Sequence, residues 1–281
     1  MTVLPRRGAA VLGSPIAHSL SPVLHQAAYD GLGLADWRYT AVECTEAELR
    51  STLERLDASG LAGVSLTMPL KRAVLPMLAR TEQLVDDVGA ANTVLFGGVA
   101  GEWWGANTDV GGMAAALRRL DVVSPKRVCV LGGGATAASA LAALREIGAA
   151  AAVVVVRRPA GVADLRAAAD RLAFAIDVLP WDDASAVVGA CDLVISTTPA
   201  GATDALPSLV SPRGDAVLFD VVYAPWPTVL AREWLSRGGR VIGGLELLVE
   251  QAALQVKLMT GQDPPVEAMR SAGQAALSLR T

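Results

Sequence analysis

Aromatic side chains are scarce in this sequence, in which Phe, Trp and Tyr together make up 4% of 281 residues. Hydrophobic residues nevertheless reach 52%, and Ala and Val supply much of that share. Small and β-branched side chains suit helices that pack closely on buried parallel strands. With charged residues at only 19%, the composition excludes a disordered chain. The length allows two domains of ordinary size.

Cysteine and histidine are also rare. Cys44, Cys129 and Cys191 are odd in number and have no C-x-x-C spacing, which excludes a complete disulfide framework. Cys129 and Cys191 lie in apolar runs, so we expect buried, reduced thiols in strands. The two histidines, His18 and His25, do not supply the ligands of a metal site. We therefore predict that the protein holds no metal.

An excess of positive charge and long apolar runs are missing as well. The net charge of −4 excludes the basic footprint of a protein that binds nucleic acid or an anionic membrane. The longest tight apolar run, residues 149–156, is far shorter than the roughly 20 residues of a membrane-spanning helix. The apolar stretch after Arg6 and Arg7 ends at Gly13, before a signal peptide could form. We expect a cytoplasmic protein.

Candidate strands and helices alternate along the whole chain. The expected strands are residues 9–12, 38–42, 62–67, 93–96, 127–131, 152–156, 193–196, 216–222 and 240–242. The expected helices include residues 23–32, 111–120, 135–147, 245–259 and 265–279. Ser21 is the expected N-cap of the first helix, and Thr45 with Glu48 forms a capping box before another. This alternation predicts an α/β fold with parallel sheets and right-handed crossovers.

A glycine-rich turn lies between a strand and a helix in the second half of the chain. Its residues are Gly132, Gly133, Gly134, Ala135, Thr136 and Ala137, which fit the pattern G-x-G-x-x-A. The first glycine permits a tight turn, and the third lets the backbone approach a pyrophosphate at the helix N-terminus. The strand before and the helix after it are the context that this motif requires. The turn predicts binding of a nicotinamide nucleotide and transfer of a hydride.

Two arginines follow the next strand. An NAD site usually has an Asp or Glu there, which accepts a hydrogen bond from the ribose 2′-hydroxyl. Here Arg157 and Arg158 occupy that place, and no acidic residue follows until Asp164. Guanidinium groups suit bidentate contact with a 2′-phosphate. The predicted cofactor is therefore NADP.

Four short polar segments in the first half are not needed by an apolar core. They are Ser19 to Ser21, Ser65 to Lys71, Ala91 to Thr93 and Asn107 to Asp109. The first lies at a helix N-terminus, where its hydroxyls could hold a carboxylate. The second lies at the carboxyl end of a strand, where open α/β sheets bind their ligands. Each segment alone is also compatible with ordinary turn chemistry.

Taken together, these motifs resemble those of the shikimate dehydrogenases nearly from end to end. The matching pieces are Ser19-x-Ser21, Thr67-x-Pro69-x-Lys71, Ala91-Asn92-Thr93, Asn107-Thr108-Asp109, the turn at 132–137, and a late segment that ends in Glu250-Gln251. The resemblance implies two α/β domains with a cleft between them. Residues 1–108 would bind substrate, and residues 109–243 would form a Rossmann-like, doubly wound NADP-binding domain. The helices of residues 244–281 would pack back on the first domain.

The resemblance also implies roles for single residues. Lys71 and Asp109 would form the catalytic pair for the NADP-dependent oxidation of shikimate to 3-dehydroshikimate. The residues implied to bind substrate are Ser19, Ser21, Thr67, Lys71, Asn92, Asp109, Tyr223 and Gln251. Ser65 replaces a common Asn and is expected to donate to a ring hydroxyl. Thr197, Val222 and Gly244 would lie along the nicotinamide half of the cofactor. A monomer or homodimer is expected.

Two alternatives stay open at this point. A quinate/shikimate dehydrogenase that uses NAD would need room for an extra ring hydroxyl near Ser65 and Thr67. The lack of an acidic residue after the second strand of the nucleotide domain argues against NAD. A non-catalytic nucleotide-binding sensor of the same fold would be expected to lose Lys71, Asp109 or Gln251. All three are present.

Overall fold

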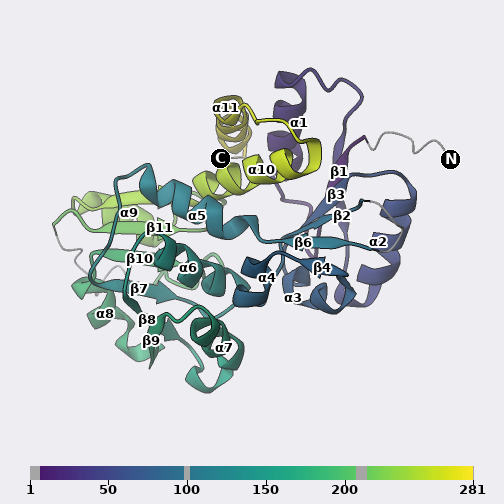
Figure 1. Ribbon diagram of the computed structural model, residues 1–281. Helices are drawn as coiled ribbons and strands as arrows, with labels where there is room; N and C mark the ends of the chain where they lie inside the picture. The colour runs from purple at the N-terminus through teal and green to yellow at the C-terminus, as the bar shows by residue number, and fades with distance from the viewer. Residues whose placement is uncertain (1–6, 98–101, 207–213, 281) are drawn as a thin grey trace. The chain divides into compact units, whose positions relative to one another are not determined.

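The computed structural model describes residues 7–97, 102–206 and 214–280, and these residues divide into two compact units. Unit 1 is the chain up to Thr108 together with Leu248–Arg280, and unit 2 is Asp109–Leu247. Figure 1 colours the chain from purple at the N-terminus to yellow at the C-terminus, so both ends of the colour scale meet within unit 1. Unit 1 is therefore discontinuous in sequence, and unit 2 is a single insertion in it.

The sheet of unit 1 has six strands in the order β2-β1-β3-β5-β6-β4. The strands are β1 (Ala9–Gly13), β2 (Tyr39–Glu43), β3 (Gly63–Leu66), β4 (Arg80–Thr81), β5 (Thr93–Leu95) and β6 (Trp104–Ala106). β1 is parallel to β2 and β3, but β5 is antiparallel to both β3 and β6. The expectation of a purely parallel sheet is therefore wrong for unit 1. Only eight residues, 96–103, connect β5 to β6, and a parallel pair would need a crossover of a dozen or more residues.

One face of this sheet is covered by helices that follow its strands. They are α2 (Leu49–Ala58), α3 (Leu70–Ala73) and α4 (Gln83–Val88), with short 3-10 turns η1 (Glu46–Glu48) and η2 (Leu75–Met77). The Thr45 and Glu48 capping box is confirmed before η1. Leu49, Leu53 and Leu56 of α2 are buried with alternate residues of β1 and β3. This core holds the strand ends at fixed positions.

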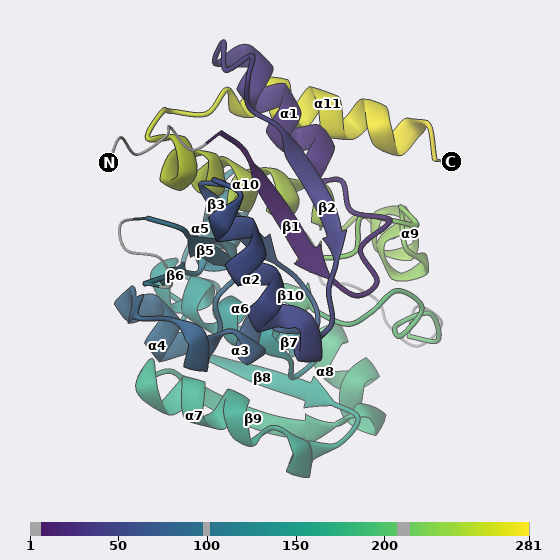
Figure 2. The same ribbon diagram turned by 90° about the vertical axis from the view of Figure 1, so that its right-hand side faces the viewer.

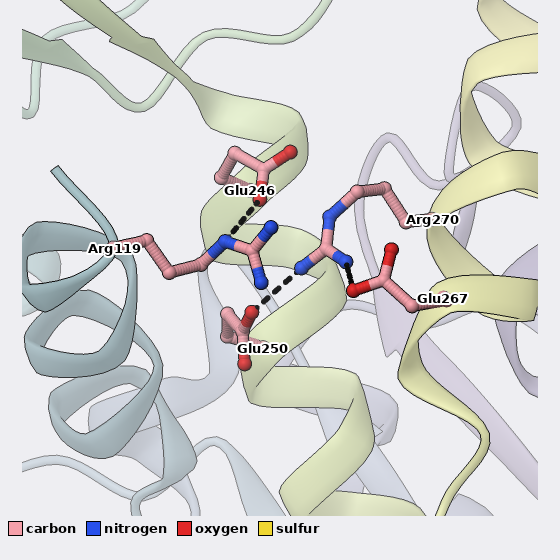
Figure 3. Close-up of polar contacts among 5 residues, drawn as sticks. All are labelled: Arg119, Glu246, Glu250, Glu267 and Arg270. Carbon is pink, nitrogen blue, oxygen red and sulfur yellow. Dashed lines mark hydrogen bonds and ion pairs between the residues drawn. The ribbon is translucent and has the colours of Figure 1, made fainter.

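Three helices from opposite ends of the chain pack together elsewhere in unit 1. They are α1 (Ser21–Gly31), α11 (Val266–Ser278) and α10 (Gly244–Thr260), which enters unit 1 at Leu248. α1 and α11 lie side by side in both views (Figures 1 and 2). Arg270 of α11 is almost buried and forms ion pairs with Glu250 of α10 at 2.8 Å and with Glu267 at 2.5 Å (Figure 3). This ion pair joins the last two helices.

The sheet of unit 2 has the order β12-β11-β10-β7-β8-β9, and every neighbouring pair is parallel. Its strands are β7 (Val128–Leu131), β8 (Ala151–Val156), β9 (Ala175–Pro180), β10 (Leu193–Ser196), β11 (Val217–Asp220) and β12 (Arg240–Gly243). This is the order of a doubly wound dinucleotide-binding sheet, with its switch point between β7 and β10. The parallel arrangement expected from the sequence is confirmed for this unit.

The helices of unit 2 alternate with its strands. They are α5 (Thr108–Arg118), α6 (Ala135–Glu146), α7 (Ala163–Arg171), α8 (Ala184–Ala190) and α9 (Val229–Ser236), with 3-10 turns η3 (Pro159–Gly161) and η4 (Trp181–Asp183). Cys129 and Cys191 are free and buried, as expected, but only Cys129 lies in a strand, since Cys191 is the C-cap of α8. Gly148 ends α6 with a φ of +87°, which is the expected left-handed C-cap. In the described parts of the chain, every helix is too short or too polar to cross a membrane.

Candidate functional site

The polar motifs of unit 1 converge on one edge of its sheet. β1 and β3 are parallel, so the segments that follow them leave the sheet at the same edge. Thr67 directly follows β3, and the loop of Ser14 to Leu20 follows β1. β5 is antiparallel to β3 and pairs Thr93 with Ser65, so Asn92 enters the sheet where Thr67 leaves it. β5, an antiparallel strand, thus adds Asn92 to the sheet edge at which the sequence had predicted polar residues.

Backbone hydrogen bonds fix these motifs relative to one another. Thr67 N donates to Leu12 O at 2.9 Å, which ties the end of β3 to β1. Leu66 N donates to Asn92 O at 2.7 Å, and Ala91 N donates to Lys71 O at 2.8 Å. Lys71 itself is half-buried on α3. The Thr67 to Lys71 segment and the Ala91 to Thr93 segment are therefore one local structure.

The serine motif forms the turn that leads into α1. Ser19 Oγ accepts a hydrogen bond from Ser21 N at 3.2 Å. Ser21 is the first residue of α1, and the N-cap is Leu20, which makes no side-chain capping bond. The expectation that Ser21 is the N-cap is therefore wrong by one residue, because the first helical hydrogen bond runs from Leu24 N to Leu20 O. Both hydroxyl groups still lie at the amino end of an 11-residue helix, which attracts negative charge.

Asn92 lies at the centre of the polar edge and is 1% exposed. Its Oδ1 accepts from Thr108 N at 2.8 Å and from the Thr93 hydroxyl at 2.8 Å. Its Nδ2 donates to Thr108 Oγ1 at 2.9 Å and to Gln251 Oε1 at 3.4 Å. Gln251 comes from α10, far along the chain. The structure therefore brings together three of the motifs that the sequence had singled out separately.

The two residues of the expected catalytic pair lie in different units. Lys71 belongs to unit 1, and Asp109 is the first residue of unit 2, directly after Thr108. Asp109 is 5% exposed. Asn107 N donates to Glu82 Oε1 at 2.6 Å, and Asn107 Nδ2 donates to Ala90 O at 2.8 Å. These bonds fix the backbone just before Asp109. Burial raises the pKa of Glu82.

Sequence reasoning missed two side chains that contact Ser65. The Tyr39 hydroxyl donates to Ser65 Oγ at 2.6 Å, and Ser65 donates in turn to Gln255 Oε1 at 2.7 Å. Gln255 is 1% exposed and donates to Thr93 Oγ1 at 3.0 Å. Residues four apart share a helix face, so the position of Gln255 four residues after Gln251 was an available signal.

The glycine turn of unit 2 leaves little room for side chains at its first two glycines. Gly132 has a φ of +110°, and a Cβ added there would lie 2.5 Å from the Thr197 hydroxyl. A Cβ on Gly133 would lie 2.8 Å from a methyl group of Val162. Around Gly134, the N-cap of α6, nothing lies within 4 Å of an added Cβ. The first two glycines are therefore required by the fold, and the third leaves open space at the helix N-terminus.

The other expected cofactor residues also follow the carboxyl ends of unit 2 strands. Arg157 and Arg158 are exposed directly after β8. Thr197 follows β10, and both its backbone N–H and its hydroxyl donate to Leu131 O at 2.8 Å. The structure thus places Thr197 beside the glycine turn, at the switch point of the sheet. Ala135 and Thr136 are the first two residues of α6 and are partly exposed.

Val222, Tyr223 and Gly244 lie at the ends of the next two strands. Asp220 ends β11, and its carboxylate accepts from Val222 N at 3.2 Å and from the Thr228 hydroxyl at 2.8 Å. Burial raises the pKa of Asp220, although these hydrogen bonds act against that shift. Gly244 N donates to Val222 O at 3.2 Å, and a Cβ on Gly244 would lie 2.1 Å from Val221 O. Only glycine allows this close approach.

No group of three or more His, Cys, Asp or Glu residues with the geometry of a metal site occurs among the residues that the structure describes. The functional groups of the two edges are hydroxyls, amides, one lysine, one aspartate and two arginines. Such groups recognise a polar organic molecule and a phosphate-bearing nucleotide.

Sequence comparison gives matches along the chain. The profile of the shikimate dehydrogenase substrate binding domain matches residues 11–94. The profile of the shikimate 5′-dehydrogenase C-terminal domain matches residues 244–272. A curated relative, the shikimate dehydrogenase (NADP(+)) of Synechocystis, is 33% identical over 274 residues, which cover 93% of each chain.

Two solved structures are similar over almost the whole chain. The shikimate dehydrogenase of Mycobacterium tuberculosis has a TM-score of 0.85 and 39% identity, and the match covers 96% of this chain and 99% of that one. The shikimate 5-dehydrogenase of Thermus thermophilus, solved in complex with NADP(H) and shikimate, has a TM-score of 0.82 and 32% identity. That match covers 96% of this chain and 100% of the other.

Proposed function

Because the chain belongs to the shikimate dehydrogenase family, we propose that it catalyses the reversible NADP-dependent oxidation of shikimate to 3-dehydroshikimate. This reaction belongs to the pathway that makes chorismate and the aromatic amino acids. The observation that carries the proposal for this chain is the contact between Asn92 and Gln251, because it joins motifs from opposite ends of the sequence at one polar edge.

In the proposal, the carboxylate and the ring hydroxyls of the substrate are each bound by side chains of matching chemistry. Ser19 and Ser21 hold the carboxylate at the amino end of α1, and Tyr223 assists them. Thr67, Asn92 and Gln251 hydrogen-bond the ring hydroxyls. Amides and hydroxyls can both donate and accept, which suits hydroxyl groups on a small ring.

Lys71 and Asp109 act on the hydroxyl that is oxidised. Removal of a hydride from a secondary alcohol requires that the oxygen also lose its proton. In the oxidation the Lys71 amine accepts that proton as the hydride leaves, and the Asp109 carboxylate stabilises the ammonium that forms. In the reverse direction Lys71 donates a proton to the carbonyl oxygen. Positioned acid–base groups contribute about 10²–10⁴-fold to a rate.

The residues of unit 2 fit NADP. The open space at Gly134 and the free N–H groups of the first turn of α6 accommodate a pyrophosphate. Arg157 and Arg158 are exposed at the position where the ribose 2′-phosphate is expected. Thr197, Val222 and Gly244 line the nicotinamide half. The hydride acceptor of the reaction is supplied by NADP when it is bound. The proposal includes a cytoplasmic location and a monomer or homodimer, both expected from the sequence.

The test is the turnover of shikimate by the purified chain, followed as NADPH absorbance at 340 nm. We expect the wild type to reduce NADP⁺ with shikimate and Lys71→Ala to lower kcat by about 10²–10⁴-fold. Lys126→Ala is the matched control, because Lys126 is exposed on a turn of unit 2. The proposal fails if the wild type forms no NADPH, or if Lys71→Ala turns over as fast as the control.

A further inference from the structure

A continuous chain of side-chain hydrogen bonds crosses the interior of unit 1. It begins at Tyr39, passes through Ser65 to Gln255, and continues from Gln255 through the Thr93 hydroxyl to Asn92 Oδ1. Each of its four donor–acceptor distances lies between 2.6 and 3.0 Å. All five residues are at least nine-tenths buried. These hydrogen bonds therefore have defined partners and are shielded from exchange with water.

Tyr39 fixes which group donates and which accepts along this series of hydrogen bonds. His25 stacks on the Tyr39 ring with centroids 3.8 Å apart, and both side chains are buried. Burial raises the pKa of Tyr39, so its hydroxyl stays protonated and donates. Ser65 accepts that bond and turns its own hydrogen towards Gln255 Oε1. Gln255 can then present only its Nε2 group to Thr93.

The same direction fixes the orientation of the Asn92 amide. Asn92 Oδ1 accepts from the Thr93 hydroxyl and from Thr108 N. Its Nδ2 donates to Thr108 Oγ1 at 2.9 Å and to Gln251 Oε1 at 3.4 Å. A flipped amide would place its NH₂ group against the Thr108 N–H, and it would lose both acceptor contacts. A buried donor left without an acceptor costs about 1–3 kcal/mol. The amino group of Asn92 is therefore held towards Thr108 Oγ1 and Gln251, and its longer contact, to Gln251, is the one that a substrate hydroxyl would replace.

We propose that Ser65 is a positioning residue rather than a substrate ligand, and that the relay Tyr39–Ser65–Gln255–Thr93 holds the Asn92 amino group in the orientation that binds a ring hydroxyl of the substrate. The inference rests on the function proposed above. It replaces the expectation that Ser65 donates to the substrate, because a serine hydroxyl has one hydrogen and Gln255 accepts it. The shikimate affinity of this chain thus depends on side chains that do not touch shikimate.

The test is a set of substitutions along the relay, assayed by steady-state kinetics. Ser65→Ala removes the hydrogen bonds to both Tyr39 and Gln255. One hydrogen bond is worth about 0.5–1.5 kcal/mol, and we expect the KM for shikimate to rise by at least the corresponding factor of about 2–10. Tyr39→Phe keeps the ring stack and removes only the first donor, and we expect a KM increase in the same range. In both variants kcat and the KM for NADP⁺ stay near the wild-type values.

Thr52→Ala is the matched control for a general loss of stability. Thr52 is equally buried in unit 1, on α2, outside the relay. We expect this variant to melt at a lower temperature and to keep the wild-type KM for shikimate. A KM increase as large as that of Ser65→Ala would show that loosening unit 1 is sufficient, and it would overturn the inference.

A double-mutant cycle separates positioning from direct contact. If Ser65 acts through Asn92, Ser65→Ala has no further effect on kcat/KM for shikimate when Asn92→Ala is already present. Additive effects of the two substitutions would make Ser65 an independent ligand and would overturn the inference, as would an unchanged KM in Tyr39→Phe. A wild-type protein that does not turn over shikimate would instead overturn the proposed function.

Discussion

In the proposed function, Arg157 and Arg158 are the residues that separate NADP from NAD. Both are exposed after β8 and lie where an acidic residue would bind the ribose of NAD. A charge-assisted hydrogen bond contributes about 1.5–3 kcal/mol. Replacing both arginines by alanine is therefore expected to raise the KM for NADP⁺ by about 10–100-fold. The KM for NAD⁺ should change little, since NAD has no 2′-phosphate.

The measurement is a comparison of kcat/KM for the two cofactors at saturating shikimate. Arg145→Ala is a suitable control, because Arg145 is an exposed arginine in the last turn of α6, at the opposite end from the glycine turn. An equal loss of kcat/KM with NADP⁺ and with NAD⁺ would mean that the arginines do not bind the 2′-phosphate.

His25 makes the stability of the protein depend on pH. Burial lowers its pKa from 6.5 to about 4. The unfolded chain binds a proton near pH 6.5 that the folded chain accepts only near pH 4, so stability is lost as the pH falls between these values. Between pH 6.5 and pH 5 the free energy of unfolding should fall by about 2 kcal/mol on this account.

Urea unfolding at a series of pH values measures this effect as the difference between the wild type and His25→Phe. The difference is needed because burial raises the pKa of Glu82 and Asp220, which acts in the opposite direction. We expect His25→Phe to lose less stability than the wild type on acidification. His18→Gln, a change at the exposed histidine, should keep the wild-type slope. If the free energy of unfolding of the wild type and of His25→Phe falls equally with pH, His25 is not the source of the pH dependence.

At the level of single residues, local motifs were predictable and long-range partners were not. The glycine turn, the arginine pair and the capping box depend on neighbours within a few residues. The Ser65 hydroxyl is directed by Tyr39 and by Gln255, which is 190 residues away in the sequence. No local pattern states that these side chains meet, so the internal hydrogen bonds of Ser65 could not be predicted from the sequence.

At the level of elements, helix boundaries and buried strands followed from the sequence, whereas strand direction in unit 1 did not. α10 and α11 lie within a residue or two of their expected limits. β4 and β6 are only two and three residues long, too short to show a period. Their pairing, and the antiparallel direction of β5, are decided by the sheet that they join.

The pairing of α10 with α11 depends on Arg270. The Arg270 side chain is 9% exposed and that of Glu250 is 14% exposed (Figure 3). Breaking a buried ion pair by removing one of its residues typically costs about 3–5 kcal/mol. Arg270→Ala is therefore expected to lower the free energy of unfolding by that amount, measured by urea denaturation.

The control for this prediction is Lys257→Ala. Lys257 and Asp263 also form an ion pair near the junction of α10 and α11, at 2.7 Å, but their side chains are 47% and 91% exposed. An exposed pair contributes about 0–1 kcal/mol. If the two substitutions destabilise the protein equally, burial is not what makes Arg270 important.

At the scale of the whole molecule, the two units differ in how the chain builds them. Unit 1 needs both ends of the sequence, because α11 packs on α1 and Gln255 completes the hydrogen bonds of Ser65. Unit 2 is continuous from Asp109 to Leu247. The residues just after α5 contact the last part of this unit, since Arg119 Nε is 3.8 Å from Glu246 Oε2 (Figure 3). Arg240 donates to Leu120 O at 2.9 Å. A continuous segment with its own core is able to fold alone.

A fragment of residues 108–247 should therefore unfold cooperatively on heating and bind NADP⁺, as followed by circular dichroism and titration calorimetry. A fragment of residues 1–108 should lack a cooperative transition, because the apolar face of α1 and the polar groups of Ser65 would lose their partners. Arg157→Ala in the first fragment serves as the binding control and should weaken the binding of NADP⁺ without lowering the melting temperature.

If residues 1–108 fold alone, the C-terminal helices are an attachment to unit 1 and not part of its core. If residues 108–247 do not fold, the nucleotide-binding sheet depends on the rest of the chain.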